Sequence, residues 1–128
     1  MKKVLIDTDI LVDHLRGVKR AKEVILKVKE RKIVGYLSAI TEAELLSGKE
    51  CKKLDKKREI EELVGLFIKI NINNKIAKKA GEFKRNYQVP LIDSIIAATA
   101  FYQKAIIWTR NLKHYSKITE IKCERPTR

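Results

Sequence analysis

Val4-Leu5-Ile6-Asp7-Thr8-Asp9-Ile10-Leu11 is a short aliphatic run that leads directly into two carboxylates. The run has no polar alternation, which is typical of a strand covered on both faces in a parallel α/β sheet. Ligands of such sheets bind beyond the carboxyl ends of the strands, where a buried carboxylate needs a cation, a proton or hydrogen-bond donors. We therefore expect Asp7 to belong to a ligand site. The alternative is that Asp7 or Thr8 only caps the following helix.

Helical and extended patterns alternate along the rest of the chain. Further strands are predicted at residues 33–37, 67–70 and 105–108, with an edge strand at 117–122 and a loose tail at 124–128. Helices are predicted at residues 9–16, 18–30, 43–46, 49–65 and 91–103, and one more begins after Asn71 or Asn73 and ends before Pro90. This alternation predicts an α/β protein.

The length of 128 residues fits a single domain, residues 1–128, with a real hydrophobic core. Cys51 and Cys123 have no neighbouring Cys or His, which argues against a zinc site or a disulfide framework. No apolar stretch approaches the ~20 residues that span a bilayer, and the start of the chain lacks the apolar region of a signal peptide. We therefore expect a cytoplasmic protein with reduced thiols and no membrane association.

The chain is strongly basic. It has 29 Lys and Arg against 16 Asp and Glu, a formal net charge of +13 and a pI near 9.8. Such a charge attracts polyanions through counterion release, and nucleic acid is the natural candidate. A chain that is 35% charged also resembles heat-adapted proteins, so the charge is only a supporting indication.

The predicted helix at residues 91–103 differs from the others because its apolar residues leave almost no polar face. This pattern predicts a central, buried helix. Asp93 lies in its first turn, where a carboxylate can simply complement the helix dipole. A functional role is the favoured interpretation, because a buried helix rarely carries an ionised group without a partner.

Polar groups stand at several ends of the predicted elements: Asp7, Asp93 and Asn111, with Glu44 as a further candidate. In a parallel sheet these ends converge on one face. Clustered carboxylates repel one another, so that without a cation at least one pKa rises. Hard oxygen ligands select Mg²⁺ or Mn²⁺, and such a site can activate water and stabilise the phosphorus transition state.

Four segments in this order resemble the PIN-domain family, and the chain is similar in size to the VapC-type ribonuclease toxins of toxin–antitoxin pairs. They are residues 5–11, residues 41–48 (Thr-Glu-Ala-Glu-Leu-Leu-Ser-Gly), residues 91–100 (Leu-Ile-Asp-Ser-Ile-Ile-Ala-Ala-Thr-Ala) and residues 108–112 (Trp-Thr-Arg-Asn-Leu). They cover essentially the whole chain at about the family's spacing.

The resemblance implies a three-layer α/β/α fold with a central, mainly parallel sheet. It further implies a Mg²⁺- or Mn²⁺-dependent endoribonuclease that hydrolyses RNA phosphodiester bonds, forms a homodimer and is inhibited by a cognate antitoxin. Two alternatives within the fold stay open: a non-catalytic RNA-binding protein, and a nuclease of RNA processing.

The resemblance also places the family's catalytic acids on Asp7, Glu44 and Asp93, with Asn111 at the fourth position. Asp7 and Asp93 are then expected as direct metal ligands. Glu44 is a third ligand in this interpretation, but Thr41-Glu42-Ala43-Glu44 also fits a capping box, in which Glu44 would accept the backbone N–H of Thr41.

The chain departs from the family's pattern at three positions. Asp9 stands where the family often has Asn or Ser, Asn111 is a neutral amide, and His114 stands where an acid is often found. We expect Asp9 and Asn111 to reach the metal through water. Thr8 and Thr109 would orient the ligands by hydrogen bonds.

The remaining candidates have ordinary interpretations. His14 and His114 are expected at the surface or an interface, because neither has a companion at metal-ligand spacing. Arg16, Arg85 and Arg110 are plausible phosphate contacts, with solvated charge as the default.

Two rival classes fit less well. A haloacid-dehalogenase-like phosphatase also has an Asp-x-Asp motif, but it requires Thr or Val at the position of Leu11. A response-regulator receiver places its phosphoacceptor Asp after the third strand, where this chain has Asn71.

Overall fold

A central sheet of five parallel strands is the framework of the computed structural model, which describes residues 1–126. The strands are β1 (Lys3–Ile6), β2 (Val34–Ser38), β3 (Ile68–Ile70), β4 (Ile106–Trp108) and β5 (Cys123–Glu124). Their order in space is β3-β2-β1-β4-β5, and every neighbouring pair is parallel. β1 therefore lies in the middle, where Leu5 is opposite Tyr36 of β2 and Ile107 of β4.

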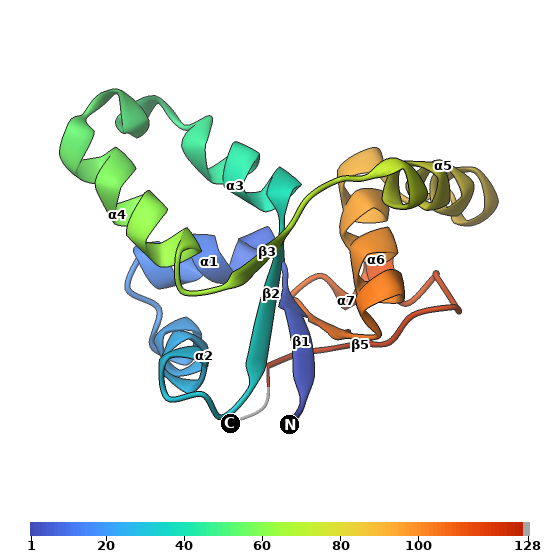
Figure 1. Ribbon diagram of the computed structural model, residues 1–128, viewed down its shortest axis with the longest axis horizontal. Coiled ribbons are helices and arrows are strands. Elements are labelled where there is room, and N and C mark those ends of the chain that lie inside the picture. The colour runs from blue at the N-terminus through green and yellow to red at the C-terminus, as the bar shows by residue number, and fades with distance from the viewer. Residues whose placement is uncertain (127–128) are drawn as a thin grey trace.

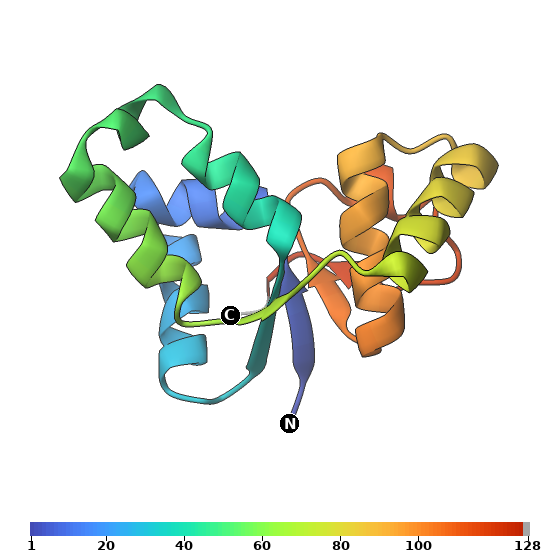
Figure 2. The same ribbon diagram turned by 45° about the horizontal axis from the view of Figure 1, so that its top comes forward.

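Helices cover both faces of this sheet. They are α1 (Thr8–Leu15), α2 (Lys19–Lys29), α3 (Ala39–Leu46), the 3-10 helix η1 (Lys49–Lys52), α4 (Leu54–Val64), α5 (Asn74–Tyr87), α6 (Leu91–Gln103) and α7 (Leu112–Tyr115). α1, α2 and α4 lie on one face, α5 and α6 on the other (Figure 1 and Figure 2). The predicted three-layer α/β/α fold with a parallel sheet is confirmed.

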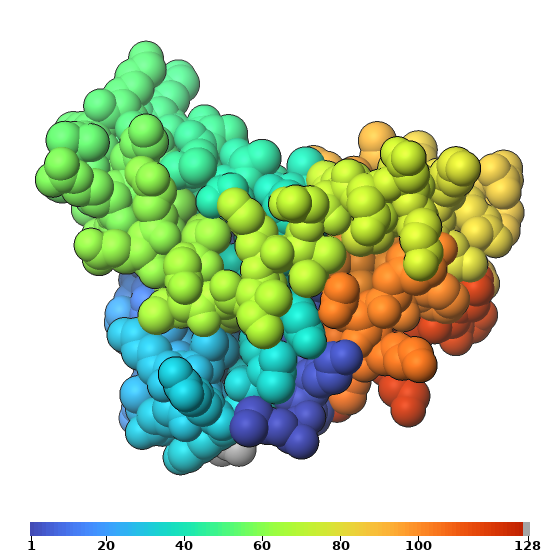
Figure 3. Space-filling model, viewed as in Figure 1, coloured from blue at the N-terminus to red at the C-terminus, as the bar shows by residue number. Residues whose placement is uncertain are grey.

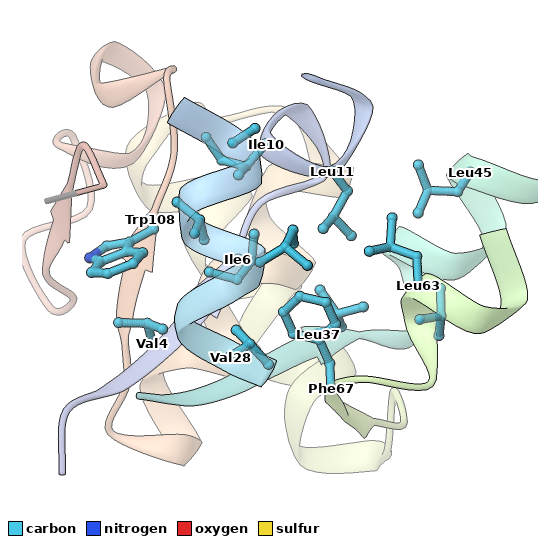
Figure 4. Packing of buried hydrophobic residues seen from close by; sticks show 14 of the residues in the cluster. Val4, Ile6, Ile10, Leu11, Val28, Leu37, Leu45, Leu63, Phe67 and Trp108 are labelled. Atoms are coloured by element: carbon cyan, nitrogen blue, oxygen red, sulfur yellow. The ribbon is translucent and has the colours of Figure 1, made fainter. Parts of the chain in front are cut away.

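β1 divides the core because its side chains alternate between the two faces. Val4 and Ile6 pack with residues of α1, α2 and α4, whereas Leu5 packs with residues of α5 and α6. Figure 4 shows the first of these clusters, with Ile6 among apolar side chains of the helices and of the neighbouring strands. Val4, Leu5 and Ile6 are fully buried, as their unbroken aliphatic run predicts.

The carboxyl edge of the sheet lies between two projecting parts of the molecule. Figure 3 shows the α3–α4 segment and the α5–α6 pair standing out on opposite sides of the central strands. α1 and α3 begin directly where β1 and β2 end, and α6 begins at the same edge before its chain returns to β4. This topology brings Asp7, Glu44 and Asp93 to one side of the sheet.

The predicted capping box at Thr41 is wrong. α3 begins at Ala39, immediately after β2, and Ser38 is its N-cap, whose hydroxyl oxygen accepts the N–H of Ile40 at 3.2 Å. Thr41 therefore lies inside the helix and is fully buried, so that Glu44 has no capping role. The cap was predicted at the wrong residue because β2 extends to Ser38, so that no loop separates this strand from α3.

Other boundaries differ at the charged and C-terminal segments. The helix predicted at residues 49–65 is divided into η1 and α4, and Asn73, not Asn71, caps α5 through the N–H of Ile76 at 2.9 Å. The edge strand predicted at residues 117–122 is instead Cys123–Glu124. Ile118 and Ile121 pack on the α5–α6 side of the core, so residues 117–122 contact that face of the sheet before β5 pairs with β4.

The C-terminal tail is more ordered than expected as far as it is described. Glu124 belongs to β5, and its carboxylate accepts the indole N–H of Trp108 at 2.8 Å. Residues 127–128 of the predicted tail lie outside the described residues.

α6 is less completely buried than its apolar sequence predicts. Residues from Ser94 to Ala100 supply its buried side chains, but Leu91 and Ile92 are 52% and 40% exposed. Over the described residues, every helix is too short or too polar to cross a membrane.

Candidate active site

Polar side chains from three helices and the loop after β4 line an open pocket of about 310 Å³ at the carboxyl edge of the sheet. Its lining residues are Asp7, Thr8, Asp9, Val12, Glu44, Asp93, Arg110 and Asn111. We call it the acidic pocket. It brings together every catalytic and metal-binding candidate of the sequence, and Thr109, fully buried, contacts Asp7 and Asp9.

Asp7 follows β1 directly and is the N-cap of α1. One carboxylate oxygen accepts the N–H of Thr8 at 2.8 Å, and the other accepts the hydroxyl of Thr109 at 2.8 Å. The side chain is buried, and burial followed by the charge of Asp9 raises the pKa of Asp7 to about 7. Asp7 is therefore both a helix cap and a carboxyl group that is difficult to ionise without a cation.

Asp9 is hydrogen-bonded to the loop after β4. Its Oδ2 accepts the backbone N–H of Arg110 at 2.9 Å and lies 3.3 Å from the hydroxyl of Thr109. Its Oδ1 is buried and has no hydrogen-bond partner among the described residues. Burial raises the pKa of Asp9 although Arg110 opposes that shift. A buried carboxylate oxygen without a donor is an unusual cost in a native protein.

Glu44 reaches the pocket from α3 and is connected to α1. Its Oε1 accepts the hydroxyl of Thr8 at 2.7 Å, and the Thr8 oxygen lies 2.9 Å from the hydroxyl of Thr41. Because the single Thr8 proton goes to Glu44, Thr8 accepts the hydroxyl proton of Thr41. The Thr8 hydroxyl thus holds the Glu44 carboxylate, and the role predicted for Thr8, orienting a metal ligand, stays a prediction.

The Asp93 carboxylate contacts residues of α7, among them His114, which was not predicted from the sequence to lie in the site. His114 Nδ1 lies 2.7 Å from Asp93 Oδ2 and 2.8 Å from Asn111 Nδ2. One ring nitrogen either donates to the carboxylate or accepts from the amide, so its proton decides which neighbour is satisfied. The Tyr115 hydroxyl lies 3.5 Å from Asp93 Oδ1, and burial followed by the charge of Asp7 raises its pKa, which keeps it a donor.

The surface role predicted for His114 is therefore incomplete, because its ring contacts two site residues. The sequence held one indication of this: His114 stands where the resembled family often has an acid. His14 lies outside the acidic pocket, and its buried Nδ1 has no partner among the described residues.

The predicted phosphate contacts are separated by the fold. Arg110 lines the acidic pocket and forms an ion pair with Asp13, with Nε 2.7 Å from Oδ2. Arg16 lines a neighbouring pocket that shares Thr8 and Glu44 with the acidic one. Arg85 is exposed on α5 and is not among the lining residues of either pocket.

The donor set fits a hard divalent cation, although the described residues include no group of three His, Cys, Asp or Glu already arranged to hold one. Asp7 has a raised pKa and Asp9 a buried oxygen without a partner, and both costs are removed by a positive charge. Mg²⁺ uses one or two carboxylates and keeps several waters, so it does not need a cage of protein ligands.

Comparisons with known proteins agree with this geometry. The family model described as PIN domain matches residues 4–119, and the chain therefore belongs to the PIN-domain family. Within it, the resemblance to VapC ribonucleases is confirmed. Ribonuclease VapC10 from Mycobacterium tuberculosis is 30% identical over 124 residues, which cover 93% of this chain and 90% of the relative.

A second relative and a solved structure extend the comparison. Ribonuclease VapC2 from Methanocaldococcus jannaschii is 28% identical over 118 residues, covering 80% of this chain and 79% of the relative. A toxin–antitoxin complex from Klebsiella pneumoniae contains a chain with a TM-score of 0.78 and 30% identity, over 92% of this chain and 94% of that chain.

Proposed function

We propose that this protein is a Mg²⁺- or Mn²⁺-dependent endoribonuclease and the toxin of a toxin–antitoxin pair. The observation that supports it best is the acidic pocket, where Asp7, Asp9, Glu44 and Asp93 meet at the carboxyl edge of a parallel sheet. Relatives named ribonucleases that match most of the chain support the same activity.

The cation, when bound, would activate a water and neutralise charge on the phosphate that is attacked. Asp7 and Asp93 are proposed as its direct ligands, with Glu44 as the third. Each Asp7 oxygen accepts one hydrogen bond, which leaves lone pairs for a cation. Asp9 and Asn111 are proposed to contact it through water.

The other residues orient these ligands or the substrate. Thr109 donates to Asp7, and Thr8 donates to Glu44, so each hydroxyl fixes one carboxylate. With its proton on Nδ1, His114 would donate to Asp93 Oδ2, which lies 2.7 Å away. Arg110 also lines the pocket, and its guanidinium is proposed as a hydrogen-bond donor to the substrate phosphate.

The proposed partners are RNA, a cognate antitoxin protein and a second copy of the chain. The net charge of +13 favours RNA. The Klebsiella toxin–antitoxin complex supports an antitoxin partner. As an RNA-cleaving toxin, the protein would act in the cytoplasm.

A panel of RNAs incubated with Mg²⁺, Mn²⁺ or EDTA tests the activity. We expect cleavage with either ion and none with EDTA, and Asp93→Asn, purified in parallel, should be inactive. Cleavage that persists in excess chelator would contradict metal dependence. RNA binding without cleavage under every ion would favour the alternative of a non-catalytic PIN-fold binder, and cleavage confined to precursor RNAs would favour a processing nuclease.

A further inference from the structure

A second pocket, of about 280 Å³, lies beside the acidic pocket and has the opposite charge. It is lined by Ile10, Asp13, Val18, Arg20, Ala21, Arg110, Arg125 and Pro126. We call it the arginine pocket. It is formed by α1, the start of α2, the loop after β4 and the chain that follows β5, which runs towards α2 in Figure 1.

Three guanidinium groups and a single carboxylate determine the charge of this pocket. Arg110 is paired with Asp13 at 2.7 Å, so these two charges compensate each other. The side chains of Arg20 and Arg125 are exposed and make no hydrogen bond or ion pair within the described part of the chain. Their donors are therefore available, and guanidinium groups match phosphate oxygens in a bidentate geometry.

Apolar side chains form the walls between the arginines. Ile10, Ala21 and Pro126 are buried, and Val18 is exposed. An apolar surface next to phosphate-binding donors suits a nucleotide, whose sugar and base have large apolar faces. The volume is near the lower end of the ~300–1,000 Å³ typical of small-molecule sites, which fits one nucleotide better than a folded protein segment.

Arg110 connects the two pockets because it lines both of them. Its backbone N–H donates to Asp9 of the acidic pocket, and its side chain pairs with Asp13 of the arginine pocket. A strand with one phosphodiester group in the acidic pocket would therefore pass Arg110 to reach the arginine pocket.

We propose that the arginine pocket binds a nucleotide of the RNA strand that flanks the phosphodiester in the acidic pocket, with its phosphate on Arg20 and Arg125. This inference rests on the proposed function for the identity of the strand as RNA. It assigns one phosphate of the substrate to specific residues, which the net charge alone does not do. An acidic protein segment is the competing ligand, since carboxylates also match guanidinium groups.

Equilibrium binding without cleavage tests the assignment. Binding of a short fluorescent single-stranded RNA is measured by anisotropy in EDTA, for the wild type, for the double variant Arg20→Gln/Arg125→Gln and for Arg31→Gln/Arg58→Gln. Arg31 and Arg58 are exposed, form no ion pair among the described residues and lie outside the arginine pocket, so the control removes the same charge. Thermal melts check that all three proteins are folded.

We expect the pocket variant to bind RNA roughly tenfold more weakly or worse, because charge-assisted contacts to one phosphate are lost. The slope of log affinity against log salt should become about 0.7 less steep, as for one lost phosphate contact on a single strand. The control should change affinity by less than threefold, a small fraction of the ~tenfold loss. Equal losses in the two variants would overturn the proposal, because only bulk charge would then matter.

A scan with single methylphosphonate linkages locates the phosphate. In the wild type, one neutral linkage should weaken binding more than its neighbours, and in the pocket variant that linkage should have no extra effect, since the partner charges are gone. A uniform scan in both proteins overturns the site. If the pocket variant binds RNA normally but fails to bind the purified antitoxin, the ligand is acidic protein and the proposal is wrong.

These measurements are independent of catalysis. If RNA binding depends on the arginine pocket but no ion supports cleavage, the assignment of the arginine pocket stands and the proposed nuclease activity fails. If RNA is cleaved with Mg²⁺ while the pocket variant binds RNA like the wild type, the nuclease activity stands and the assignment of the arginine pocket fails.

Discussion

Asp7 has fewer favourable contacts than its burial requires. Two hydrogen bonds, from Thr8 and Thr109, favour the ionised carboxylate, yet burial and the charge of Asp9 raise its pKa to about 7. An ionised Asp7 therefore destabilises the metal-free fold. Such a cost is typical of residues kept for function, because a simple helix cap can be provided by an uncharged Ser or Asn.

This cost predicts how metal-free stability depends on pH. The pKa of Asp7 is about 7 in the folded protein and near its ordinary 3.8 when unfolded, so between these values the folded state binds more protons. The contribution of Asp7 to stability is most favourable below the pKa of the unfolded state. It falls by at most about 4 kcal/mol as the pH rises to 7 and is constant at higher pH. In EDTA, the melting temperature should fall from about pH 5 to about pH 8, and less steeply in Asp7→Asn. Parallel curves for the two proteins would contradict the assignment.

Glu44→Gln separates charge from hydrogen bonding at the third acid. Gln keeps an oxygen that accepts the Thr8 hydroxyl, at 2.7 Å in the wild type, but it is a poor ligand for a hard dication. We expect loss of most RNA cleavage at a nearly unchanged melting temperature. Thr41→Ala is the control, because it removes the hydroxyl behind Thr8 and should cost about 1 kcal/mol of stability while most cleavage remains. Full activity of Glu44→Gln would limit the site to the aspartates.

The contact of His114 with the acidic pocket was not predictable from the sequence alone. Asp7 and Asp93 were predictable because each stands at the end of a recognisable strand or helix. The contact between His114 and Asp93 joins residues 21 positions apart and depends on the short helix α7, for which no periodic pattern exists in the sequence. Such a contact follows from tertiary packing and not from local chemistry.

At the level of elements, α3 shows how a local sequence pattern can misplace the start of a helix. Thr41 and Glu44 satisfy the local pattern of a capping box. The helix starts earlier because β2 ends at Ser38, and Thr41 is turned inward to the hydroxyl of Thr8 on α1. The existence of the helix was predictable from sequence, but its first residue was decided by a contact between elements.

Two helix caps provide a matched test of this element. Ser38 caps α3, which carries Glu44, whereas Asn73 caps α5, which carries no residue of the acidic pocket. Ser38→Ala and Asn73→Ala should each lower the free energy of unfolding by about 1 kcal/mol, measured by urea denaturation. Only Ser38→Ala should also slow RNA cleavage, because it loosens the start of the helix that positions Glu44. Equal activity of the two variants would show that the cap does not affect the site.

For the whole molecule, the parallel topology gathers the acids in one place. Residues as far apart as Asp7 and Asp93 meet because β1 is central and α6 begins at the same edge as α1. The alternation of patterns predicted this edge, and the aliphatic run of residues 4–6 predicted the central strand. The position of β5 was not predictable, because its two residues pair with β4 only after the preceding segment has packed Ile118 on the α5–α6 side of the core.

The same gathering of charge predicts that metal stabilises the whole fold. A cation that binds only the folded state adds about 2.7 kcal/mol at a hundredfold excess over its Kd. Mg²⁺ or Mn²⁺ should therefore raise the melting temperature of the wild type by several degrees relative to EDTA, and by much less in Asp93→Asn. Asp55→Asn is the matched control, because Asp55 is exposed on α4 outside the acidic pocket, and it should retain the full shift.

In EDTA, Asp93→Asn should be at least as stable as the wild type, since it removes one of the clustered negative charges. Equal metal-induced shifts in the wild type and Asp93→Asn would remove Asp93 from the proposed ligands, and a large loss of stability in EDTA would make it a structural residue.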